Sequence, residues 1–290
     1  GTNNVAVGYD SLQSNTTASN NVAIGYDSLR SNTTGSSNIA VGNYALDANT
    51  TANNNVAVGY FALTDNSTGL RNTGVGQSAL ANNTTADDNV AIGTQALLNN
   101  TTGTDNTALG SFALTTNTTA DNNTAVGYKS LTANTTGTQN VAVGSLALDA
   151  NTTANNNVAV GYQSLTSNTT GLRNIAIGSV ALQSNTTASD NVAVGNQALD
   201  TNTTGSNNTA VGSNALDANT TGTFNTAIGS SSSKAITTGS YNTIVGGNSL
   251  FNATTAGFNT GLGVAALFAT TTGSNNTAIG YESLQQNTTA

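Results

Sequence analysis

A 17-residue repeat runs through the whole chain without one insertion or deletion. Glycine recurs at residues 8, 25, 42 and every seventeenth residue to 280, and leucine occupies the position of Leu12 in sixteen of seventeen copies. We number the positions of one coil 1 to 17 from the first residue, so that residue 18 is again position 1. From position 4 the consensus reads N-[VT]-A-[VI]-G-x-x-[AS]-L-x-x-N-T-T-[GA]-x-x. Such a fixed period predicts a solenoid, in which each repeat packs on its two neighbours.

The length of the repeat selects the kind of solenoid. Seventeen residues are too few for the helix pair of a helical solenoid, so each repeat predicts one coil of a parallel β-solenoid. Val5, Ala6 and Val7 alternate as a strand does. We expect Val5 and Val7 to face the core, together with Leu12 on a second short strand. The glycine at position 8 and the Asn-Thr-Thr segment have the composition of turns.

The array fills the chain, and we expect one continuous all-β domain of seventeen coils over residues 1–290, as a fragment of a longer fibre or a unit within it. Threonine stands at position 5 in eight copies, and these hydroxyls should bond a neighbouring backbone or lie at the edge of the core. A bias toward Asn, Thr, Gly and Ser also occurs in disordered segments. Disorder does not, however, require leucine and valine in register through seventeen copies.

The composition excludes whole classes of function. Charged residues make up 6% of the chain, and 5 basic against 13 acidic residues leave a net charge of −8. This pattern offers no basic surface to nucleic acid and no polybasic patch to lipid headgroups. No apolar run approaches the roughly 20 residues that span a bilayer. The chain has neither cysteine nor histidine, and its one adjacent carboxylate pair, Asp87 and Asp88, fits a solvated turn. We therefore expect no catalysis, no cofactor and no metal site.

Aromatic residues gather in two columns near the end of the array. Position 3 is aromatic in three consecutive coils, and position 13 is aromatic in two. The coil between residues 222 and 238 is also irregular, because it lacks both the usual leucine and the usual asparagine. We consider two interpretations, a stacked ladder that stabilises the fold and a contact patch for a neighbouring chain or ligand. The residues concerned are Phe224, Tyr241, Phe258, Phe251 and Phe268.

The asparagine at position 15 stands in an N-x-[ST] sequence in fourteen copies. These sequons would accept N-glycans in a eukaryotic secretory route, and in a bacterium the threonine pairs would be the O-glycan candidates. The alternative is a turn in which asparagine and threonine satisfy backbone groups. The threonine columns also suit ice binding, with only one of two adjacent threonines facing outward. The first glycan candidates are Asn15, Asn32, Asn49, Asn66, Asn83 and Asn100.

Position 6 is alanine in fourteen of seventeen copies and is never charged. Because a small apolar strand face permits close approach of a second backbone, we expect this column to be an oligomer face, represented by Ala91, Ala108 and Ala125. In another column, Arg71 precedes Asp88 by one coil, and Arg173 precedes Asp190 in the same way. We expect exposed ion pairs there, each contributing about 0–1 kcal/mol.

The segment Asn4-Val5-Ala6-Val7-Gly8, with serine or alanine three residues later, resembles the N-[SV]-V-A-[IV]-G-x-x-[SA] head repeats of trimeric autotransporter adhesins. The resemblance extends over every repeat. It implies a left-handed parallel β-roll that trimerises, lies on the bacterial surface and binds host or matrix components. The coil here is longer than the usual family repeat, carries an N-T-T segment and never varies in spacing. Similar arrays occur in phage tail-fibre-like proteins.

These observations together predict a non-enzymatic, extracellular or cell-surface fibre or adhesin shaft that associates with copies of itself. The expected partners are further copies and a host surface, matrix or glycan, with no nucleic acid and no membrane insertion. The alternatives are an ice-binding solenoid that uses its threonine columns and a segment of a phage tail fibre.

Overall fold

A computed structural model describes residues 1–289 and contains only strands, turns and bends in that range. Each coil contributes one strand of three residues at positions 5 to 7. The chain forms two compact units, Gly1–Val143 and Gly144–Ala290. The strands are β1 (Val5–Val7), β2 (Val22–Ile24), β3 (Ile39–Val41), β4 (Val56–Val58), β5 (Thr73–Val75), β6 (Val90–Ile92), β7 (Thr107–Leu109), β8 (Thr124–Val126), β9 (Val141–Val143), β10 (Val158–Val160), β11 (Ile175–Ile177), β12 (Val192–Val194), β13 (Thr209–Val211), β14 (Thr226–Ile228), β15 (Thr243–Val245), β16 (Thr260–Leu262) and β17 (Thr277–Ile279).

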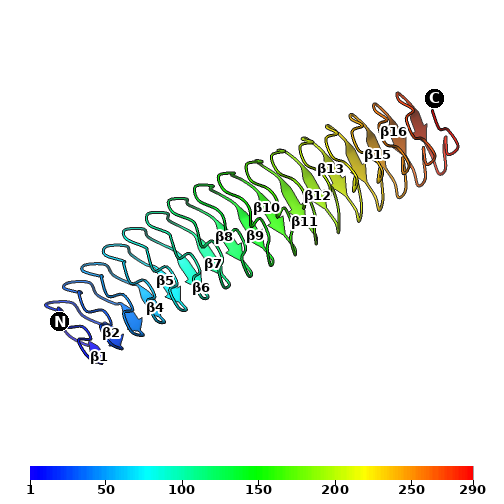
Figure 1. Ribbon diagram of the computed structural model, residues 1–290. Coiled ribbons are helices and arrows are strands. Elements are labelled where there is room, and N and C mark those ends of the chain that lie inside the picture. The colour runs from blue at the N-terminus through cyan, green and yellow to red at the C-terminus, as the bar shows by residue number, and fades with distance from the viewer. Residues whose placement is uncertain (290) are drawn as a thin grey trace. The chain divides into compact units, whose positions relative to one another are not determined.

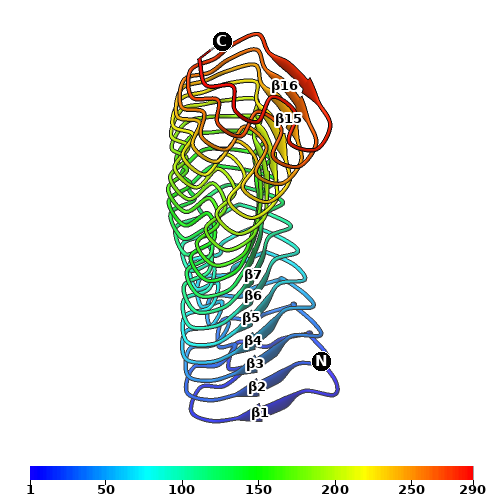
Figure 2. The same ribbon diagram turned by 90° about the vertical axis from the view of Figure 1, so that its right-hand side faces the viewer.

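Within each unit the strands pair in chain order, parallel and in register. In the first unit β1 to β9 stack one on the next, with Val5 opposite Val22 and Ala6 opposite Ala23. In the second unit β10 to β17 do the same. Figure 1 shows the arrows of neighbouring coils side by side, and Figure 2 shows β1 to β7 one above another. The predicted parallel β-solenoid with one 17-residue coil per strand is confirmed.

The face of the strand that points inward is the opposite of the predicted one. From the second coil on, position 6 is buried, and Ala23 and Ala40 are 0% exposed, whereas their strand neighbours Ile24 and Ile39 are 38% and 41% exposed. The interior of the coil is narrow, as Gly74 shows at this position. A β-carbon added there would lie 3.3 Å from Cδ1 of Leu63, one coil earlier. Because position 6 faces the leucine column at this distance, the inward side must be small, and the valines point outward.

The predicted second strand around Leu12 does not form. Residues 9–14 of the coil are a turn, and the leucine of each coil has a positive φ, with 52° at Leu29. This conformation is costly for a residue with a β-carbon, by about 1–2 kcal/mol. The leucine side chain is nevertheless fully buried in the coils between the two end coils, and the Leu29 N–H donates to the Ala45 carbonyl of the next coil at 2.9 Å. Burial and the bond between coils together offset the backbone cost.

Two features require glycine at position 8, its positive φ and the close approach of the backbone of the next coil. At Gly42 φ is 136°, and an added β-carbon would lie 2.4 Å from the carbonyl oxygen of Gly59 in the next coil. Successive coils approach too closely here for any side chain. This accounts for the unbroken glycine column in the sequence.

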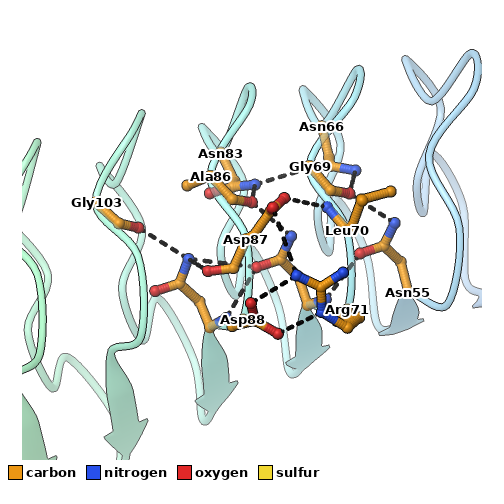
Figure 3. Close-up of polar contacts among 12 residues, drawn as sticks. Asn55, Asn66, Gly69, Leu70, Arg71, Asn83, Ala86, Asp87, Asp88 and Gly103 are labelled. Atoms are coloured by element: carbon orange, nitrogen blue, oxygen red, sulfur yellow. Dashed lines mark hydrogen bonds and ion pairs between the residues drawn. The ribbon is translucent and has the colours of Figure 1, made fainter.

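Two buried columns of asparagine join the coils. At position 15, Asn49 Nδ2 donates to Asn32 Oδ1 at 2.8 Å and to the carbonyl of Ala52 at 3.2 Å. At position 4, the Asn55 N–H donates to Asn38 Oδ1 at 3.0 Å, while Asn55 Nδ2 donates to the Gly69 carbonyl at 2.8 Å. Figure 3 shows both kinds of bond around Asn66, Asn83 and Asn55. Because buried amide groups must be paired, each asparagine ties its own turn to a neighbouring coil.

Candidate functional site

The described residues 1–289 contain no enclosed pocket and no group of three or more His, Cys, Asp or Glu side chains placed to hold a metal. No helix in this range is long and apolar enough to cross a membrane. The candidate functional surfaces are therefore the columns of identical or similar side chains that the coils present to solvent.

One such surface is the outward strand face, which we define in each unit as positions 5 and 7 of its strands, β1–β9 in the first unit and β10–β17 in the second. Position 5 is Val, Ile or Thr and position 7 is Val, Ile or Leu in every coil, so the face carries no charge along its length. Its side chains are half-buried or exposed, with Ile92 at 43% and Ile177 at 40%. Contiguous exposed apolar surface of this kind marks interaction sites in soluble proteins. The eight threonines at position 5 belong to this face rather than to the edge of the core, and the prediction for them is wrong.

The expected oligomer face does not lie on the surface. Ala91, Ala108 and Ala125 are 0% exposed, because position 6 points into the coil against leucine. A second chain cannot reach these side chains. The reason that they stay small is internal packing, and the outward face of the same strands carries the large apolar side chains.

The N-glycan candidates are also internal. Asn32, Asn49, Asn66, Asn83 and Asn100 are 0% exposed, and their amide nitrogens donate to the preceding asparagine and to their own turn. Asn15, in the first coil, is partly exposed, and its Nδ2 donates to the Ala18 carbonyl at 3.3 Å. A glycan on the five buried amides is incompatible with this packing. The turn interpretation is the one that the geometry supports.

The two threonines after this asparagine have different roles. At position 16, Thr101 Oγ1 donates to the Thr118 carbonyl of the next coil at 3.0 Å, and the same bond recurs along the column. At position 17 the threonine is exposed in all seventeen coils, as at Thr85 and Thr102. Each unit thus displays an outer row of threonines at position 17. The expectation that only one of the two columns faces outward is confirmed.

The aromatic residues near the end of the array form two separate stacks. The ring centroids of Phe224 and Tyr241 lie 5.2 Å apart, those of Tyr241 and Phe258 lie 5.0 Å apart, and both pairs are within 6° of parallel. All three rings are at least half exposed. Phe251 and Phe268 stack on each other at 5.4 Å and are half-buried. The rings of both columns therefore stack, as the ladder interpretation expects, and a contact with a neighbouring chain or ligand stays a prediction.

A second aromatic group lies at the beginning of the array, and the sequence analysis missed it. We define the tyrosine cluster as Tyr9, Tyr26, Tyr44, Tyr60 and Phe61. Its rings touch without a gap through four coils, at centroid distances between 4.2 and 6.3 Å. The aromatic residues are visible in the sequence, but they are divided between positions 9 and 10. The third coil carries its tyrosine, Tyr44, one residue later than its neighbours do. A search along single columns does not join the two.

Charged side chains pair between neighbouring coils, as the sequence predicts. Arg71 donates two hydrogen bonds to the Asp88 carboxylate, from Nε to Oδ1 at 2.6 Å and from Nη2 to Oδ2 at 2.7 Å (Figure 3). Arg173 and Asp190 repeat this geometry. The hydrogen bond from Arg71 holds the pKa of the Asp88 carboxyl below its usual value. Asp87, the other member of the adjacent acidic pair, accepts the N–H of Leu70 at 2.7 Å, so both carboxylates serve contacts between coils.

Position 13 carries a different set of charges, which are partly buried. Burial, followed by the charge of Asp217, raises the pKa of Asp200. Burial also raises the pKa of Asp217, against the opposing effect of Lys234, whose Nζ lies 3.9 Å from the carboxylate. Carboxylates that lose water in this way make the coil less stable when they are ionised.

No protein-family model and no curated protein matches this chain. The solenoid fold and its surfaces are the basis of the functional argument that follows.

Proposed function

We propose that this chain is a non-catalytic structural and adhesive solenoid of an extracellular fibre, and that copies of it pack side by side through the outward strand face. The single observation that carries the proposal is the uncharged Val, Ile, Leu and Thr surface of positions 5 and 7. Burial of apolar surface is the main favourable term in protein association, and this surface is left open to water by the coil itself.

A second copy fits this face better than an unrelated partner does. The face repeats at every coil, with a rise of about 4.8 Å between parallel strands, and a second solenoid has the same repeat. In the first unit, nine strands present two such side chains each, so the face extends through all nine coils of that unit.

The extracellular and adhesive parts of the proposal have independent support. The chain has no cysteine and no methionine, so it contains little that oxidation would damage. The head repeats that it resembles belong to surface adhesins. Labelling of intact source cells with an antibody against the chain tests the location, and labelling only after lysis would contradict it.

Lateral packing is tested by charge placed on the face. We expect the 28.7 kDa chain to scatter light as an oligomer, and Leu109→Lys with Val126→Lys to reduce it to a monomer. The matched control is Asn122→Lys with Gln139→Lys, which adds the same charge on exposed position 3 and should leave the mass unchanged. A wild-type chain that is monomeric at working concentration, or a face variant that assembles like the wild type, refutes lateral packing.

Ice binding is the second candidate, and the outer threonine row at position 17 is the observation that favours it. We expect wild-type protein to show thermal hysteresis if the row orders water. Thr85→Lys with Thr102→Lys should abolish it, because both side chains lie in the row. Thermal hysteresis no greater than that of a matched inert protein removes this candidate.

A further inference from the structure

The tyrosine cluster is an exposed aromatic strip with no covering segment among residues 1–289. Tyr9, Tyr26 and Tyr60 are 67%, 42% and 48% exposed, and Tyr26 and Tyr60 contact the half-buried ring of Tyr44. Three rises between four coils make the strip about 15 Å long at roughly 4.8 Å per coil. Tyrosine is enriched at binding sites because it offers a large rigid surface with a polar end.

The strip is bounded sharply and is not a general property of position 9. The following coils carry Gln77, Thr94 and Ser111 there. Tyr162 stands at the same position in the second unit with 52% exposure and has no ring partner among the described residues. At positions 9 and 10 the described later coils hold a single ring pair, Phe112 and Tyr128, with centroids 6.1 Å apart. Rings that touch at these positions through four successive coils are therefore a local feature of the first four coils. The solenoid does not need them to stack its coils.

The exposed fractions of Tyr9, Tyr26 and Tyr60 leave ring surface open to a ligand. Tyr9 and Tyr26 are stacked at 9° and Tyr44 and Phe61 at 10°, whereas Tyr26 meets Tyr44 at 64° and Tyr60 meets Phe61 at 66°. Aromatic faces carry partial negative charge and attract groups with positive edges, such as the C–H faces of sugar rings, and they attract cations.

The charge around the strip is negative. Asp10 and Asp27 flank Tyr9 and Tyr26, and the charge of Asp27, followed by burial, raises the pKa of the Tyr26 hydroxyl. Asp27 is 5% exposed, and its Oδ1 has no hydrogen-bond partner. Arg30, a nearby cation, is shared between Asp27 at 3.5 Å and Asp47 at 3.3 Å. A polyanion is disfavoured here, and a ligand with positive groups is favoured.

We propose that the tyrosine cluster binds a linear polysaccharide that carries amino groups. A flat strip without a pocket suits a long ligand that lies along the solenoid axis, with sugar rings against the tyrosine faces and ammonium groups near Asp10 and the ring faces. The inference rests on the adhesive part of the proposed function and names the chemistry of its partner. It does not depend on lateral packing through the outward strand face.

Binding is measured with the full 290-residue chain and a soluble glucosamine polymer, by the change in tyrosine fluorescence, which no tryptophan obscures. We expect Tyr26→Ala and Tyr60→Ala each to weaken binding at least tenfold, and Tyr26→Phe to retain most of it. Tyr162→Ala is the matched control and should bind as the wild type does. Circular dichroism of each variant confirms that the coils remain folded.

The ligand assignment is tested with a fully N-acetylated polymer, a neutral glucan and a polyanionic polysaccharide. We expect binding to follow the amino groups and to fall with added salt. Equal binding of the neutral glucan overturns the role of the amino groups. Equal losses in Tyr26→Ala and Tyr162→Ala, or no binding by the wild type, overturn the site. Light scattering of Tyr26→Ala separates this outcome from a failure of lateral packing, because the mass should stay that of the wild type.

Discussion

Coils 6–8 (residues 86–136) and coils 14–16 (residues 222–272) fill the same interior with different side chains. In coils 6–8 each coil supplies alanine at position 6, leucine at position 12 and asparagine at position 15. In coils 14–16, Ser233 replaces a leucine, Ile236 replaces an asparagine, Ile244 replaces an alanine, and Gly261 follows it one coil later. All of these side chains remain buried.

The substitutions compensate one another in pairs. Gly74 faces Leu63, so position 6 of one coil meets position 12 of the coil before it. The equivalent pair in coils 14 and 15 is Ile244 and Ser233, in which the added isoleucine replaces volume that the serine lost. Gly261 then makes room in turn, because a β-carbon there would lie 3.1 Å from Cδ1 of Ile244. The interior therefore constrains the total volume of neighbouring coils more strongly than the residue at any one position.

The compensation is incomplete for polar groups. The asparagine column at position 15 is interrupted after Asn219, whose Oδ1 has no donor because Ile236 follows it. The hydroxyls of Ser232 and Ser233 are buried and also lack partners. Each unsatisfied buried group costs about 1–3 kcal/mol. We expect coils 14–16 to be less stable than coils 6–8, although their backbone ladders have the same pattern.

The largest change in stability is expected when the core residues of coils 14–16 are introduced into coils 6–8. Leu97→Ser should destabilise the chain by about 3–5 kcal/mol, since it removes a buried leucine. Adding Ala108→Ile and Ala125→Gly recreates the arrangement of Ser233, Ile244 and Gly261, and should recover at least half of the loss. Urea denaturation followed by circular dichroism measures both. A triple variant that is no more stable than Leu97→Ser alone would falsify the pairing of positions 6 and 12.

The asparagine column offers a test of intermediate size. Asn117 donates to Asn100 at 2.9 Å and to Ala120 at 3.0 Å, and it also accepts a bond from Asn134 at 3.0 Å. Asn117→Ala should therefore cost about 3 kcal/mol.

The matched variant is Asn219→Ala, at the point where the column is interrupted. Asn219 keeps its two donated bonds, to Asn202 at 2.8 Å and to Gly222 at 3.1 Å, but accepts none. Its replacement should cost about 1 kcal/mol less than that of Asn117, which corresponds to one hydrogen bond. Equal losses in denaturation midpoint would show that the accepted bond contributes nothing.

The free energy of local opening can be compared between the two regions in the wild-type chain, by amide hydrogen exchange. The amide of Ser233 donates to the Ser249 carbonyl at 2.9 Å, and that of Leu114 donates to Ser130 at 3.0 Å. Native-state hydrogen exchange should be about tenfold faster at Ser233, because the missing leucine and the unpaired hydroxyls lower the free energy of opening by about 1.4 kcal/mol. Ser233 stands at position 12 of the fourth coil from the C-terminus, and Leu63 stands at position 12 of the fourth coil from the N-terminus. Exchange of the Leu63 amide therefore controls for proximity to a chain end. Exchange at Leu63 as fast as at Ser233 would assign the effect to the chain end.

The smallest effect concerns the carboxylates that lead into coil 14. The pKa of Asp200 is raised in the folded state, so its contribution to stability is present below its unfolded pKa, near 3.9, and is lost as pH rises through the folded pKa. Asp200→Asn should therefore raise the melting temperature at pH 7, by no more than about 1 kcal/mol in free energy, and leave it unchanged at pH 3.

Asp88 in the regular region should behave in the opposite way. Its pKa is lowered by Arg71, so its contribution is present above the unfolded pKa and is lost as pH falls through the folded value. Asp88→Asn should lower the melting temperature slightly at pH 7 and not at pH 2. Two variants with the same pH profile would contradict the difference in burial and pairing between these carboxylates.

The sequence alone determined the period, the number of coils, the parallel strands and the outer threonine row. This was possible because a stacked solenoid places each repeat in nearly the same environment. The residue that each position of the coil needs therefore recurs in most of the seventeen repeats. The ion pair of Arg71 and Asp88 and the stack of Phe224, Tyr241 and Phe258 followed from the same period, since residues 17 apart become neighbours.

The direction in which each strand face points was decided only by the tertiary structure. Alternation shows that Val5 and Val7 share a face, but it does not show whether that face or the alanine face is internal. The answer depends on the width of the coil, which is set by the leucine at position 12 with its positive φ and by the two buried asparagine columns. Because such a narrow interior accepts alanine and amide ladders rather than valine, the apolar residues that looked like the core became the surface that is open to a partner.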